Sequence, residues 1–515
     1  MFDLGRTFLQ SVERSPGSLA LVDGGLRLSY ADWAPRVFAL SHALHSLGLR
    51  RGDAVLSLLQ NRWEAATLHW ACQFLGVVIT PLNWRAKADE VAYCLRDAEA
   101  RAVFFESVSA AALEAVPHAQ RLPLIGVGPV ETGGYRFAEL LTAPAQQPGL
   151  LASADDLSVM LYTSGTTGAP KGVPRRHRAE RAAAVAHVAQ NRYARGECTL
   201  GVMPLYHTMG VRSLLAMALV DGCLVCMPRF DAALALELIE RERITALYLV
   251  PTLYHDLLAD PGFSSARVST ARKLGFAGAP MHDALLQRLQ AAFAPEQLIN
   301  HYGSSEVYTF TVEPNAARKP GSAGRAGINA RVRVVALDGA TPTQPEQLLA
   351  AHCEGQIIAD LRGDEAFEGY WKRPDADSKS LRAGWYFTGD TGYVDSEGDI
   401  FVTGRVDDMI ISGGENIFPT EIESVLSTHP GVDEVAVAGM RDERWGQRVV
   451  AFIKRRVGVE LNAALLDAHC RGSQLNNFKR PREYIFVRQI PRSPVGKLLR
   501  RKLTCGEFER DDTLG

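Results

Sequence analysis

Short apolar runs alternate with amphipathic stretches through the first hundred residues of the chain. An apolar run between turn residues is typical of a strand covered on both faces, and apolar residues at helical spacing are typical of a helix. We expect helices over 30–47 (after Ser29 and ending at Gly48), 64–75 and 88–98, and strands over 54–59, 77–80 and 102–105. Strands and helices that alternate at this spacing pair in parallel with right-handed crossovers, which predicts an α/β core of layered units.

The length of 515 residues predicts about three folding units, at roughly 100–200 residues for each. Hydrophobic residues make up 47% of the chain and charged residues 22%, so wholesale disorder is excluded. The 56 basic and 58 acidic side chains give a net charge of −2. This balance argues against a nucleic-acid binder that works by neutralising phosphates.

The eight cysteines are spread too widely to form the disulfide framework of a small secreted domain. Cys223 and Cys226 form a CxxC, but the run around them is apolar and no second ligand pair follows at zinc spacing, which predicts a buried strand. The N-terminus lacks the pattern of a signal peptide, and the longest apolar stretch, 214–227, is shorter than the ~18 residues of a membrane span. We therefore expect a cytoplasmic protein that binds neither membranes nor nucleic acids.

A polar segment at 404–408 separates a second unit from the first. Beyond it we expect a helix over 417–426 with Pro419 near its start, strands over 435–437 and 449–453, and a helix that includes 465–470. About 110 residues with their own apolar faces are enough for a small α+β domain.

The segment 162–173 carries the clearest chemistry in the chain. It reads Tyr-Thr-Ser-Gly-Thr-Thr-Gly-Ala-Pro-Lys-Gly-Val and follows an apolar run. Its glycines can present consecutive N–H groups to an anion, its hydroxyls add donors, and Lys171 adds a positive charge, so it fits a polyphosphate. Because Pro170 precedes Lys171 and no GxGxxG is present, the segment is neither an ordinary P-loop nor a Rossmann loop.

This segment resembles the phosphate-binding signature of the acyl-adenylate-forming superfamily, which includes acyl-CoA synthetases, peptide-synthetase adenylation domains and luciferases. Further motifs of that superfamily follow in order, at 203–210, 275–280, 302–306, 319–325, 384–390, 404–410 and 494–497. The resemblance implies a large N-terminal adenylation domain over 1–404, a hinge at 405–408 with Asp407 as the pivot, and a smaller mobile domain over 409–515.

The resemblance also assigns roles to particular residues. The implied catalytic residues are Lys497, Glu306, Ser305 and Lys171, and Glu306 would also bind Mg²⁺. The implied ATP site comprises Thr163, Ser164, Gly165, Thr166, Thr167, Gly168, Gly278, Ala279, Pro280, Tyr302, Gly303, Asp390 and Arg405. Ser305 stands where the superfamily usually has Thr, and it keeps the hydroxyl.

The implied reaction has two halves. A carboxylate attacks the α-phosphate of Mg·ATP to give an acyl-adenylate and pyrophosphate, and a thiol then attacks the acyl carbon. No carrier segment follows residue 515 and no condensation region precedes the core, so we expect free CoA as the acceptor. Amino-acid-activating relatives have an Asp soon after the segment of His207, and none occurs over 208–214, so an amino-acid substrate is not expected.

The C-terminal unit is most similar to that of aryl-CoA ligases acting on benzoate and halobenzoates. This likeness implies CoA contacts from Gly413, Gly414, Trp445, Phe478 and Arg480, although Trp445 and Phe478 could instead belong to the domain core. The acyl pocket would draw on His207, Tyr248, Ala279, His301, Tyr308 and Thr309. A compact, partly polar pocket favours a benzoate-like or furoate-like acid.

Several alternatives stay open at this point. The acid could be a medium-chain fatty acid, and the enzyme could load a separate carrier protein in place of CoA. A non-catalytic nucleotide binder is disfavoured by Lys497, Glu306 and Asp390, and a homodimer remains open. The basic run 175–178 could attract a phosphate, but a run of charges at a helix start favours a solvated face.

Overall fold

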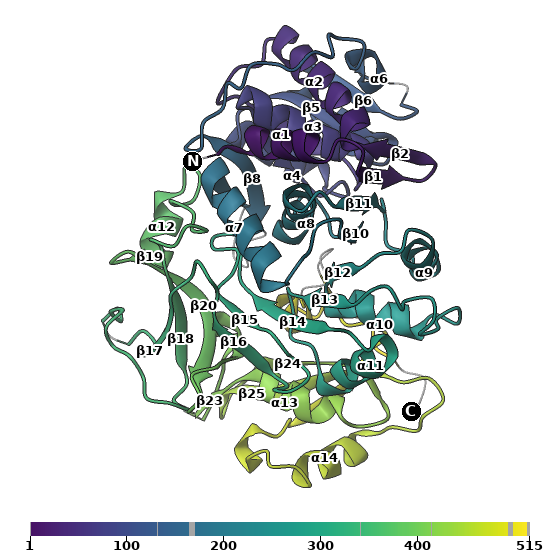
Figure 1. The fold of residues 1–515 in the computed structure, drawn as a ribbon. Coiled ribbons are helices and arrows are strands. Elements are labelled where there is room, and N and C mark those ends of the chain that lie inside the picture. The colour runs from purple at the N-terminus through teal and green to yellow at the C-terminus, as the bar shows by residue number, and fades with distance from the viewer. Residues whose placement is uncertain are drawn as a thin grey trace.

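The structure is a computed structural model that describes residues 2–130, 132–163, 170–339, 341–413, 415–492 and 498–511. Its described part contains three β-sheets, two of them in the large N-terminal unit and one in the small C-terminal unit. Figure 1 shows the earliest helices in purple at the top, the strands β17 and β18 at the left, and the C-terminal helix α14 at the bottom. The predicted α/β class is therefore confirmed.

The first sheet has the strand order β7-β6-β5-β3-β4-β8-β9. Its strands are β3 (Ala54–Leu58), β4 (Val78–Pro81), β5 (Ala100–Glu106), β6 (Leu124–Val127), β7 (Tyr135–Arg136), β8 (Leu157–Thr163) and β9 (Lys171–Arg176). The central strands β3, β4, β5, β6 and β8 pair in parallel, and β9 returns antiparallel to β8. This is the parallel pairing that the strand–helix alternation predicts.

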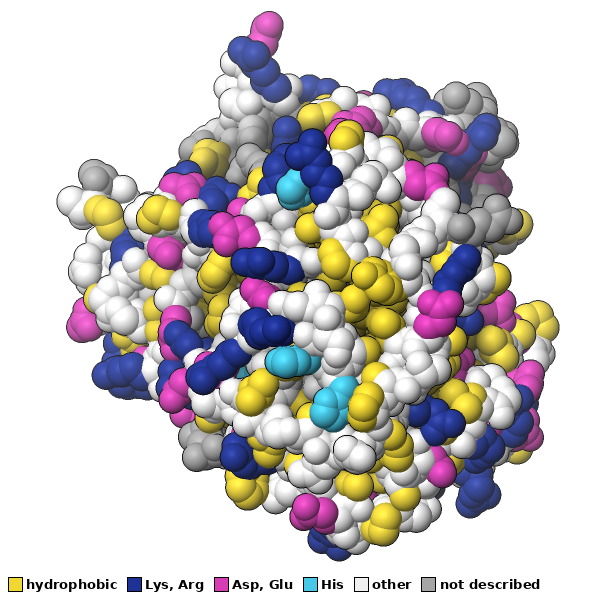
Figure 2. Space-filling model, turned by 90° about the horizontal axis from the view of Figure 1, so that it is seen from above, with side chains coloured by type: hydrophobic (Ala, Val, Ile, Leu, Met, Phe, Trp, Pro, Cys, Tyr) yellow, Lys and Arg dark blue, Asp and Glu magenta, His cyan; other side chains and the backbone are white. Residues whose placement is uncertain are grey.

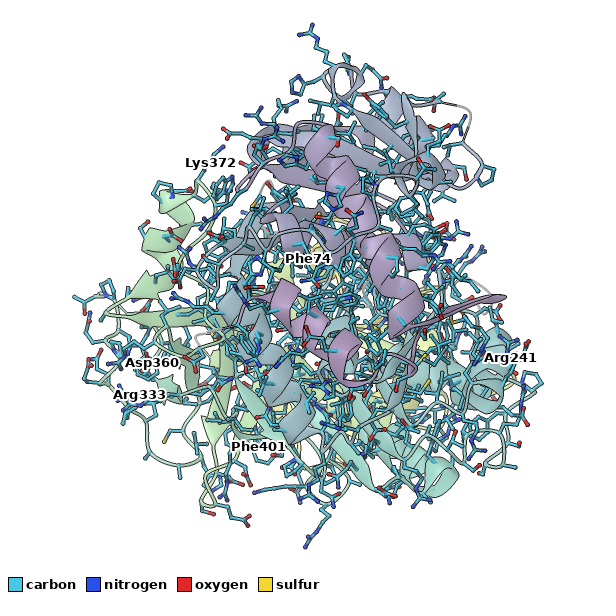
Figure 3. All side chains as sticks on the ribbon, turned by 45° about the horizontal axis from the view of Figure 1, so that its top comes forward. Phe74, Arg241, Arg333, Asp360, Lys372 and Phe401 are labelled. Carbon is cyan, nitrogen blue, oxygen red and sulfur yellow. The ribbon has the colours of Figure 1, made fainter. Side chains whose placement is uncertain are left out.

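Three helices of this region begin and end within one residue of the predicted bounds: α2 (Tyr30–Ser46), α3 (Trp63–Leu75) and α4 (Ala88–Asp97). The structure adds elements that were not predicted, namely α1 (Leu4–Arg14), α5 (Ser107–Glu114), α6 (Phe137–Leu140) and the 3₁₀ turn η1 (Ala119–Arg121). Ser29 caps α2 with a capping box that includes Asp32, so the helix start follows from local sequence. Phe74 of α3 packs edge-on against Phe8 and Phe38, which anchors these helices in one aromatic core (Figure 3).

The second sheet is longer and follows the order β17-β18-β20-β21-β16-β15-β14-β13-β12-β10-β11-β1-β2, with β19 beside β20. Its strands are β1 (Leu19–Asp23), β2 (Leu26–Ser29), β10 (Cys198–Gly201), β11 (Cys223–Cys226), β12 (Ala246–Leu249), β13 (Lys273–Phe276), β14 (Gln297–Tyr302), β15 (Thr311–Glu313), β16 (Ser322–Ala326), β17 (Val332–Val335), β18 (Gly355–Asp360), β19 (Leu381–Arg382), β20 (Trp385–Val394) and β21 (Ile400–Arg405). The run β11-β10-β12-β13-β14 is parallel, and antiparallel strands continue from β14.

Helices accompany this sheet: α7 (His177–Gln190), α8 (Thr208–Leu219), α9 (Ala232–Arg241), α10 (Pro251–Ala259), α11 (Asp283–Phe293) and α12 (Pro374–Ser380). Helices α7 and α8 pack against each other and link the two N-terminal sheets (Figure 1). Cys223 and Cys226 are buried in β11, so the predicted core strand is confirmed. Within the described residues, no group of three or more His, Cys, Asp or Glu side chains could hold a metal ion.

The C-terminal unit is an α+β domain with its own core, as the sequence predicts. Its elements are η2 (Val406–Asp408), β22 (Ile410–Ser412), β23 (Glu415–Ile417), α13 (Pro419–Ser427), β24 (Val432–Asp442), β25 (Gly446–Arg455), α14 (Ala463–Arg471), η3 (Asn477–Lys479), β26 (Glu483–Phe486) and α15 (Arg500–Thr504). The helix predicted from residue 417 begins at Pro419, because Ile417 still belongs to β23. Strands β24 and β25 form a hairpin longer than predicted, since hairpin pairing extends past the apolar stretch.

The surface has the mixed charge that the composition predicts. Figure 2 shows Lys and Arg interspersed with Asp and Glu over the face in view. Among the helices of the described residues, none is long and apolar enough to cross a membrane.

Candidate functional site

The predicted nucleotide residues gather where the parallel strands end. Gly278, Ala279 and Pro280 follow β13, and Gly303 to Glu306 follow β14, the neighbouring parallel strand. Ligands of open α/β sheets bind at the carboxyl ends of the strands, so this edge is the expected crevice. A Cβ atom on Gly303 would lie 2.0 Å from the Tyr308 carbonyl oxygen, so the tight fold-back of this loop requires glycine.

Tyr370 connects the two predicted catalytic residues Glu306 and Lys171. Its hydroxyl donates to Glu306 Oε1 at 2.7 Å, and Lys171 Nζ lies 4.7 Å from its ring centroid. Burial, and then the carboxylate of Glu306, hold the pKa of Tyr370 far above its usual value, so the phenol stays a donor. Sequence reasoning missed Tyr370, because it lies in none of the recognised motifs and is 64 residues from Glu306 in the chain.

Replacing Tyr370 by Phe tests this connection. We expect Tyr370→Phe to lower kcat/KM for Mg·ATP about tenfold, since a hydrogen bond to a charged group contributes roughly 1.5–3 kcal/mol and part of it is lost. The loss should appear mainly in the KM for Mg·ATP, measured by pyrophosphate release. Tyr393→Phe is the control, because Tyr393 stacks on Phe401 and contacts no predicted site residue in the described part. Equal kinetics of the two variants would contradict the assignment.

A second group lies at the junction of β14, β20 and β21. The hydroxyl of Tyr302 donates to Asp390 Oδ2 at 2.7 Å, and Arg405 Nη1 contacts Asp390 Oδ1 at 2.5 Å. Burial, and then Asp390, raise the pKa of Tyr302 far above its usual value. The structure thus brings together three of the predicted ATP-site residues, which are 88 and 15 positions apart in the chain.

The predicted acyl-pocket residues have different surroundings in the structure. Tyr248 and His301 are buried, their ring centroids lie 5.2 Å apart, and both come from the parallel strands. His207 caps the N-terminus of α8, where its Nδ1 accepts from the backbone N–H of Met209. Ala279 follows β13, as described above, and the hydroxyls of Tyr308 and Thr309 have protein partners. Tyr308 donates to Glu180 at 3.1 Å, and Thr309 Oγ1 accepts from Arg212 Nη1 at 3.1 Å.

Three further residues surround Tyr248 and His301, and sequence reasoning missed them. His187 and Asn191, at the C-terminal end of α7, and Arg212 of α8 are all buried beside these rings. All three lie outside the recognised motifs, and only the packing of α7 and α8 against the sheet brings them here. The presence of polar residues on apolar helix faces was the available sequence signal.

The basic run 175–178 is not a solvated face, and this prediction is wrong for half of it. Arg175 and His177 are fully buried, whereas Arg176 and Arg178 are partly exposed and pair with Glu368. Arg175 Nε donates to Glu180 at 2.8 Å, and the side chains of both residues are 0% exposed. The reason is that Arg175 and Arg176 are consecutive residues of β9. Their side chains therefore point to opposite faces of the sheet, and that of Arg175 points into the core.

The described CoA-side residues lie in the C-terminal unit. Trp445 and Phe478 are 41% and 40% exposed, so they are not domain-core residues. Gly413 has φ = 62°, and a Cβ there would lie 2.8 Å from the Trp445 ring. Arg480 already pairs with Asp467 at 2.5 Å. Asp407 lies in η2, beside the Asp408 that pairs with Arg500 at 3.1 Å.

Some predicted residues fall outside the described part of the chain. They are Ser164, Gly165, Thr166, Thr167, Gly168, Gly414 and Lys497. Thr163 and Lys171, which flank the first group, are directly paired across β8 and β9. The predicted phosphate segment therefore connects two adjacent antiparallel strands. Ser305 is half-buried in the loop that leads to Glu306.

The residues present fit a Mg²⁺ ion that is shared with ATP. Glu306 offers one buried carboxylate, of which Oε1 accepts from Tyr370. Mg²⁺ commonly takes one or two carboxylates and completes its shell with water and substrate phosphates. A single carboxylate at this position is consistent with that preference.

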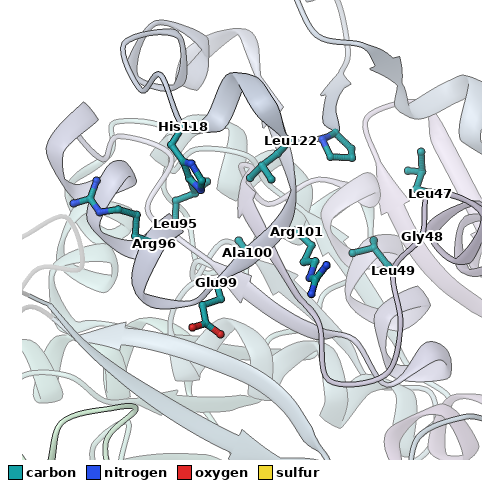
Figure 4. A pocket seen from close by; sticks show the side chains of 11 residues that line it. Leu47, Gly48, Leu49, Leu95, Arg96, Glu99, Ala100, Arg101, His118 and Leu122 are labelled. Atoms are coloured by element: carbon teal, nitrogen blue, oxygen red, sulfur yellow. The ribbon is translucent and has the colours of Figure 1, made fainter.

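A surface depression of about 530 Å³ lies elsewhere, between α4, β5 and the end of α2 (Figure 4). It is lined by Leu47, Gly48, Leu49, Leu95, Arg96, Glu99, Ala100, Arg101, His118, Leu122 and Pro123. None of these is a predicted site residue. The depression is therefore separate from the candidate site.

Comparison with known proteins gives matches along nearly the whole chain. Residues 8–371 match the family described as AMP-binding enzyme, and residues 421–497 match the AMP-binding enzyme C-terminal domain. A 4-chlorobenzoate–CoA ligase of Arthrobacter sp. is 33% identical over 503 residues, which cover 96% of this chain and 93% of that protein. A long-chain-fatty-acid–CoA ligase of Mycobacterium tuberculosis is also 33% identical, over 509 residues and 98% of both chains. The crystal structure of ATP-bound MatB from Rhodopseudomonas palustris has a TM-score of 0.89 at 28% identity, covering 98% of this chain and 99% of that one.

Proposed function

The chain belongs to the AMP-binding enzyme family as an acid–CoA ligase, and we propose that its acid is a small aromatic or heteroaromatic carboxylate. The reaction proceeds through an acyl-adenylate, with ATP and CoA as co-substrates.

In the first half-reaction, the acid's carboxylate oxygen attacks the α-phosphorus of ATP, and the bond to the bridging oxygen of pyrophosphate breaks. Phosphoryl chemistry needs mainly positioning and charge neutralisation, so no protein nucleophile is required. In our proposal, residues 163–168 and Lys171 hold the phosphates, and Ser305 and Lys497 meet the charge that develops on the α-phosphate. Mg²⁺ would neutralise phosphate charge, with Glu306 as its protein ligand.

The nucleotide's sugar and base would lie on the other side of β14. In our proposal, Asp390 accepts hydrogen bonds from the ribose hydroxyls, and Arg405 orients Asp390. Tyr302 stacks on the adenine ring, which lies beside residues 278–280. The contacts among Tyr302, Asp390 and Arg405 support this placement, since they fix the carboxylate from two sides before ATP binds.

In the second half-reaction, the CoA sulfur attacks the acyl carbon and AMP leaves. We propose domains over 1–404 and 409–515 that rotate about 405–408 at Asp407 and bring Gly413 and Gly414 to the acyl carbon. The exposed rings of Trp445 and Phe478 would then contact CoA, and Arg480 would hold a phosphate by sharing its guanidinium with Asp467.

A cytoplasmic location of the enzyme and its assembly as a homodimer remain predictions.

The buried ring cluster is the observation that carries the choice of acid. Tyr248 and His301 lie at the carboxyl ends of parallel strands. The side chains of His187 and Arg212 pack against the Tyr248 ring. A long alkyl chain against these polar atoms would leave them unpaired, which is costly, whereas a flat ring packs against aromatic faces. Relatives named for 4-chlorobenzoate are 33% and 37% identical, and one named for long-chain fatty acids is 33% identical, so identity alone does not decide.

A substrate panel scored by CoA-dependent AMP release tests the proposal. We expect benzoate-type and furoate-type acids to exceed octanoate in kcat/KM by at least about tenfold, because a flat ring packs against the aromatic faces of Tyr248 and His301 and an alkyl chain does not. Octanoate above every ring acid would overturn the choice of acid. Pyrophosphate exchange without any CoA thioester would instead indicate an enzyme that loads a carrier protein.

A further inference from the structure

Three aromatic rings form a closed triangle between the second sheet and helices α7 and α8. The ring centroids of His187 and Tyr248 lie 4.7 Å apart, those of His187 and His301 5.3 Å, and those of Tyr248 and His301 5.2 Å. All three side chains are 2% exposed or less. Gly275 leaves room for the triangle, because a Cβ atom there would lie 3.0 Å from the Tyr248 ring and 3.3 Å from Asn191 Oδ1.

The triangle faces the acid side of the site. His301 and Tyr302 are consecutive in β14, so their side chains point to opposite faces of the sheet. Tyr302 reaches Asp390 on the nucleotide side. His301 therefore lies on the face where Tyr248 of β12 and the helices α7 and α8 meet.

Each ring carries one buried polar atom that has no hydrogen-bond partner among the described residues. These atoms are the Tyr248 hydroxyl oxygen, His301 Nδ1 and His187 Nε2. Buried polar atoms in proteins are nearly always paired, and an unpaired one costs about 1–3 kcal/mol. Three such atoms in one cluster point to a missing polar partner.

Asn191 determines which of these atoms donate. Its Nδ2 donates to the His187 backbone carbonyl at 2.8 Å, and a carbonyl can only accept, so this atom must be the amide nitrogen. The same nitrogen then donates to His187 Nδ1, and Asn191 Oδ1 accepts from His301 Nε2 at 3.1 Å. His187 therefore keeps its proton on Nε2, and His301 leaves Nδ1 as an acceptor.

Both imidazoles stay neutral in the assay range of pH. Burial, and then the charge of Arg212, lower the pKa of His301 to about 3, and the same causes hold the pKa of His187 well below its usual value. The cluster therefore offers one acceptor, one N–H donor and a phenol that can do either.

We propose that these three side chains recognise a hydroxyl group on the ring of the acid, so that the enzyme selects hydroxy-substituted aromatic acids. A hydroxyl both donates and accepts, which matches His301 Nδ1 and His187 Nε2–H together. An aromatic amine would donate to His301 Nδ1 but would not accept from His187 Nε2–H, and a methyl group would do neither. This inference rests on the proposed aryl-CoA ligase function and names its substrate class.

Isosteric acids test the recognition. We expect the hydroxyl/methyl ratio of kcat/KM to be at least about 30-fold, for 3-hydroxybenzoate against 3-methylbenzoate or for 4-hydroxybenzoate against 4-methylbenzoate. Tyr248→Phe should reduce the ratio for the preferred isomer at least about fivefold, because the loss of its hydroxyl affects the hydroxy acid more than the methyl acid.

Tyr254→Phe is the matched control. Tyr254 is also fully buried, but its hydroxyl donates to the carbonyls of Leu247 and Gly275 at 3.1 and 2.9 Å. In the ligand-free enzyme we expect Tyr254→Phe to lower the melting temperature and to leave the hydroxyl/methyl ratio intact. Tyr248→Phe should not lower the melting temperature, because it removes a polar atom that has no partner.

The possible outcomes separate this inference from the proposed aryl-CoA ligase function. Turnover of ring acids with a hydroxyl/methyl ratio near one would overturn this inference and leave the aryl-CoA ligase proposal standing. A lower melting temperature for Tyr248→Phe would show that its hydroxyl is already paired in the free enzyme, and would also overturn the inference. Preference for octanoate over all ring acids would overturn both proposals.

Discussion

Arg175→Met is expected to lower the free energy of unfolding of the N-terminal unit by about 3–5 kcal/mol, the usual result of removing one partner of a buried ion pair. Arg175 and Glu180 are both fully buried, and Arg175 Nη1 also donates to the backbone carbonyls of Glu306 and Glu365 at 3.1 and 2.6 Å. Its loss would leave the Glu180 carboxylate with the Tyr308 hydroxyl as its one remaining side-chain partner among the described residues. Urea unfolding followed by tryptophan fluorescence measures the change.

The neighbouring Arg178→Met is the control for this prediction. Arg178 is 45% exposed and pairs with Asp155 and Glu368, each at 2.7 Å. Exposed pairs of this kind contribute about 0–1 kcal/mol, so its unfolding midpoint should scarcely move.

A double variant separates loss of charge balance from loss of packing. Arg175→Met combined with Glu180→Gln removes the stranded carboxylate and should recover part of the lost stability. If the double variant were less stable than Arg175→Met by the full cost of Glu180→Gln alone, the two residues would not be coupled, and our account of the buried pair would be wrong.

Lys497→Ala is expected to lower the rate of adenylation by about 100–1000-fold, as the loss of one group that stabilises transition-state charge commonly does. The superfamily resemblance gives Lys497 this role, and the residue lies outside the described part of the chain. Formation of the CoA thioester from supplied acyl-adenylate should largely persist, because the thiol's attack needs no positive charge at the α-phosphate. Single-turnover assays of each half-reaction give the two rates.

Lys502→Ala provides the matched control in the same domain. Lys502 lies on α15, is 51% exposed, and pairs only loosely with Glu507, at 3.8 Å. Its removal should leave both half-reactions unchanged. Equal losses in the two half-reactions of Lys497→Ala would contradict the alternating use of the C-terminal domain.

The helices and strands near the N-terminus could be predicted because their signals are local. Ser29 caps α2 through contacts within three residues, and the apolar run of β3 is bounded by its own turn residues. The extent of the hairpin of β24 and β25 could not be read in this way. Its register depends on pairing between strands, and pairing carries polar residues beyond the apolar run into the sheet.

The candidate site shows the same division. Glu306, Asp390 and Lys171 could be found because each lies in a motif with fixed spacing. Tyr370 and Arg212 could not, since each acts on a residue that is distant in the chain and neither has a local pattern. The wrong prediction for Arg175 has the same origin, because the partners that stabilise its buried guanidinium, Glu180 and the carbonyls of Glu306 and Glu365, are brought to it by the fold.

The sequence by itself therefore determined the α/β class, because strand–helix alternation is a property of consecutive residues. It also carried the motifs whose resemblance to a known superfamily implies the ligase chemistry. The tertiary structure decided which polar side chains are buried and which of them are left without partners. Those properties depend on how α7 and α8 cover the sheet. The packing brings His187, which no sequence motif marked, against the predicted pocket residues Tyr248 and His301, and these are the three side chains that we propose recognise the acid.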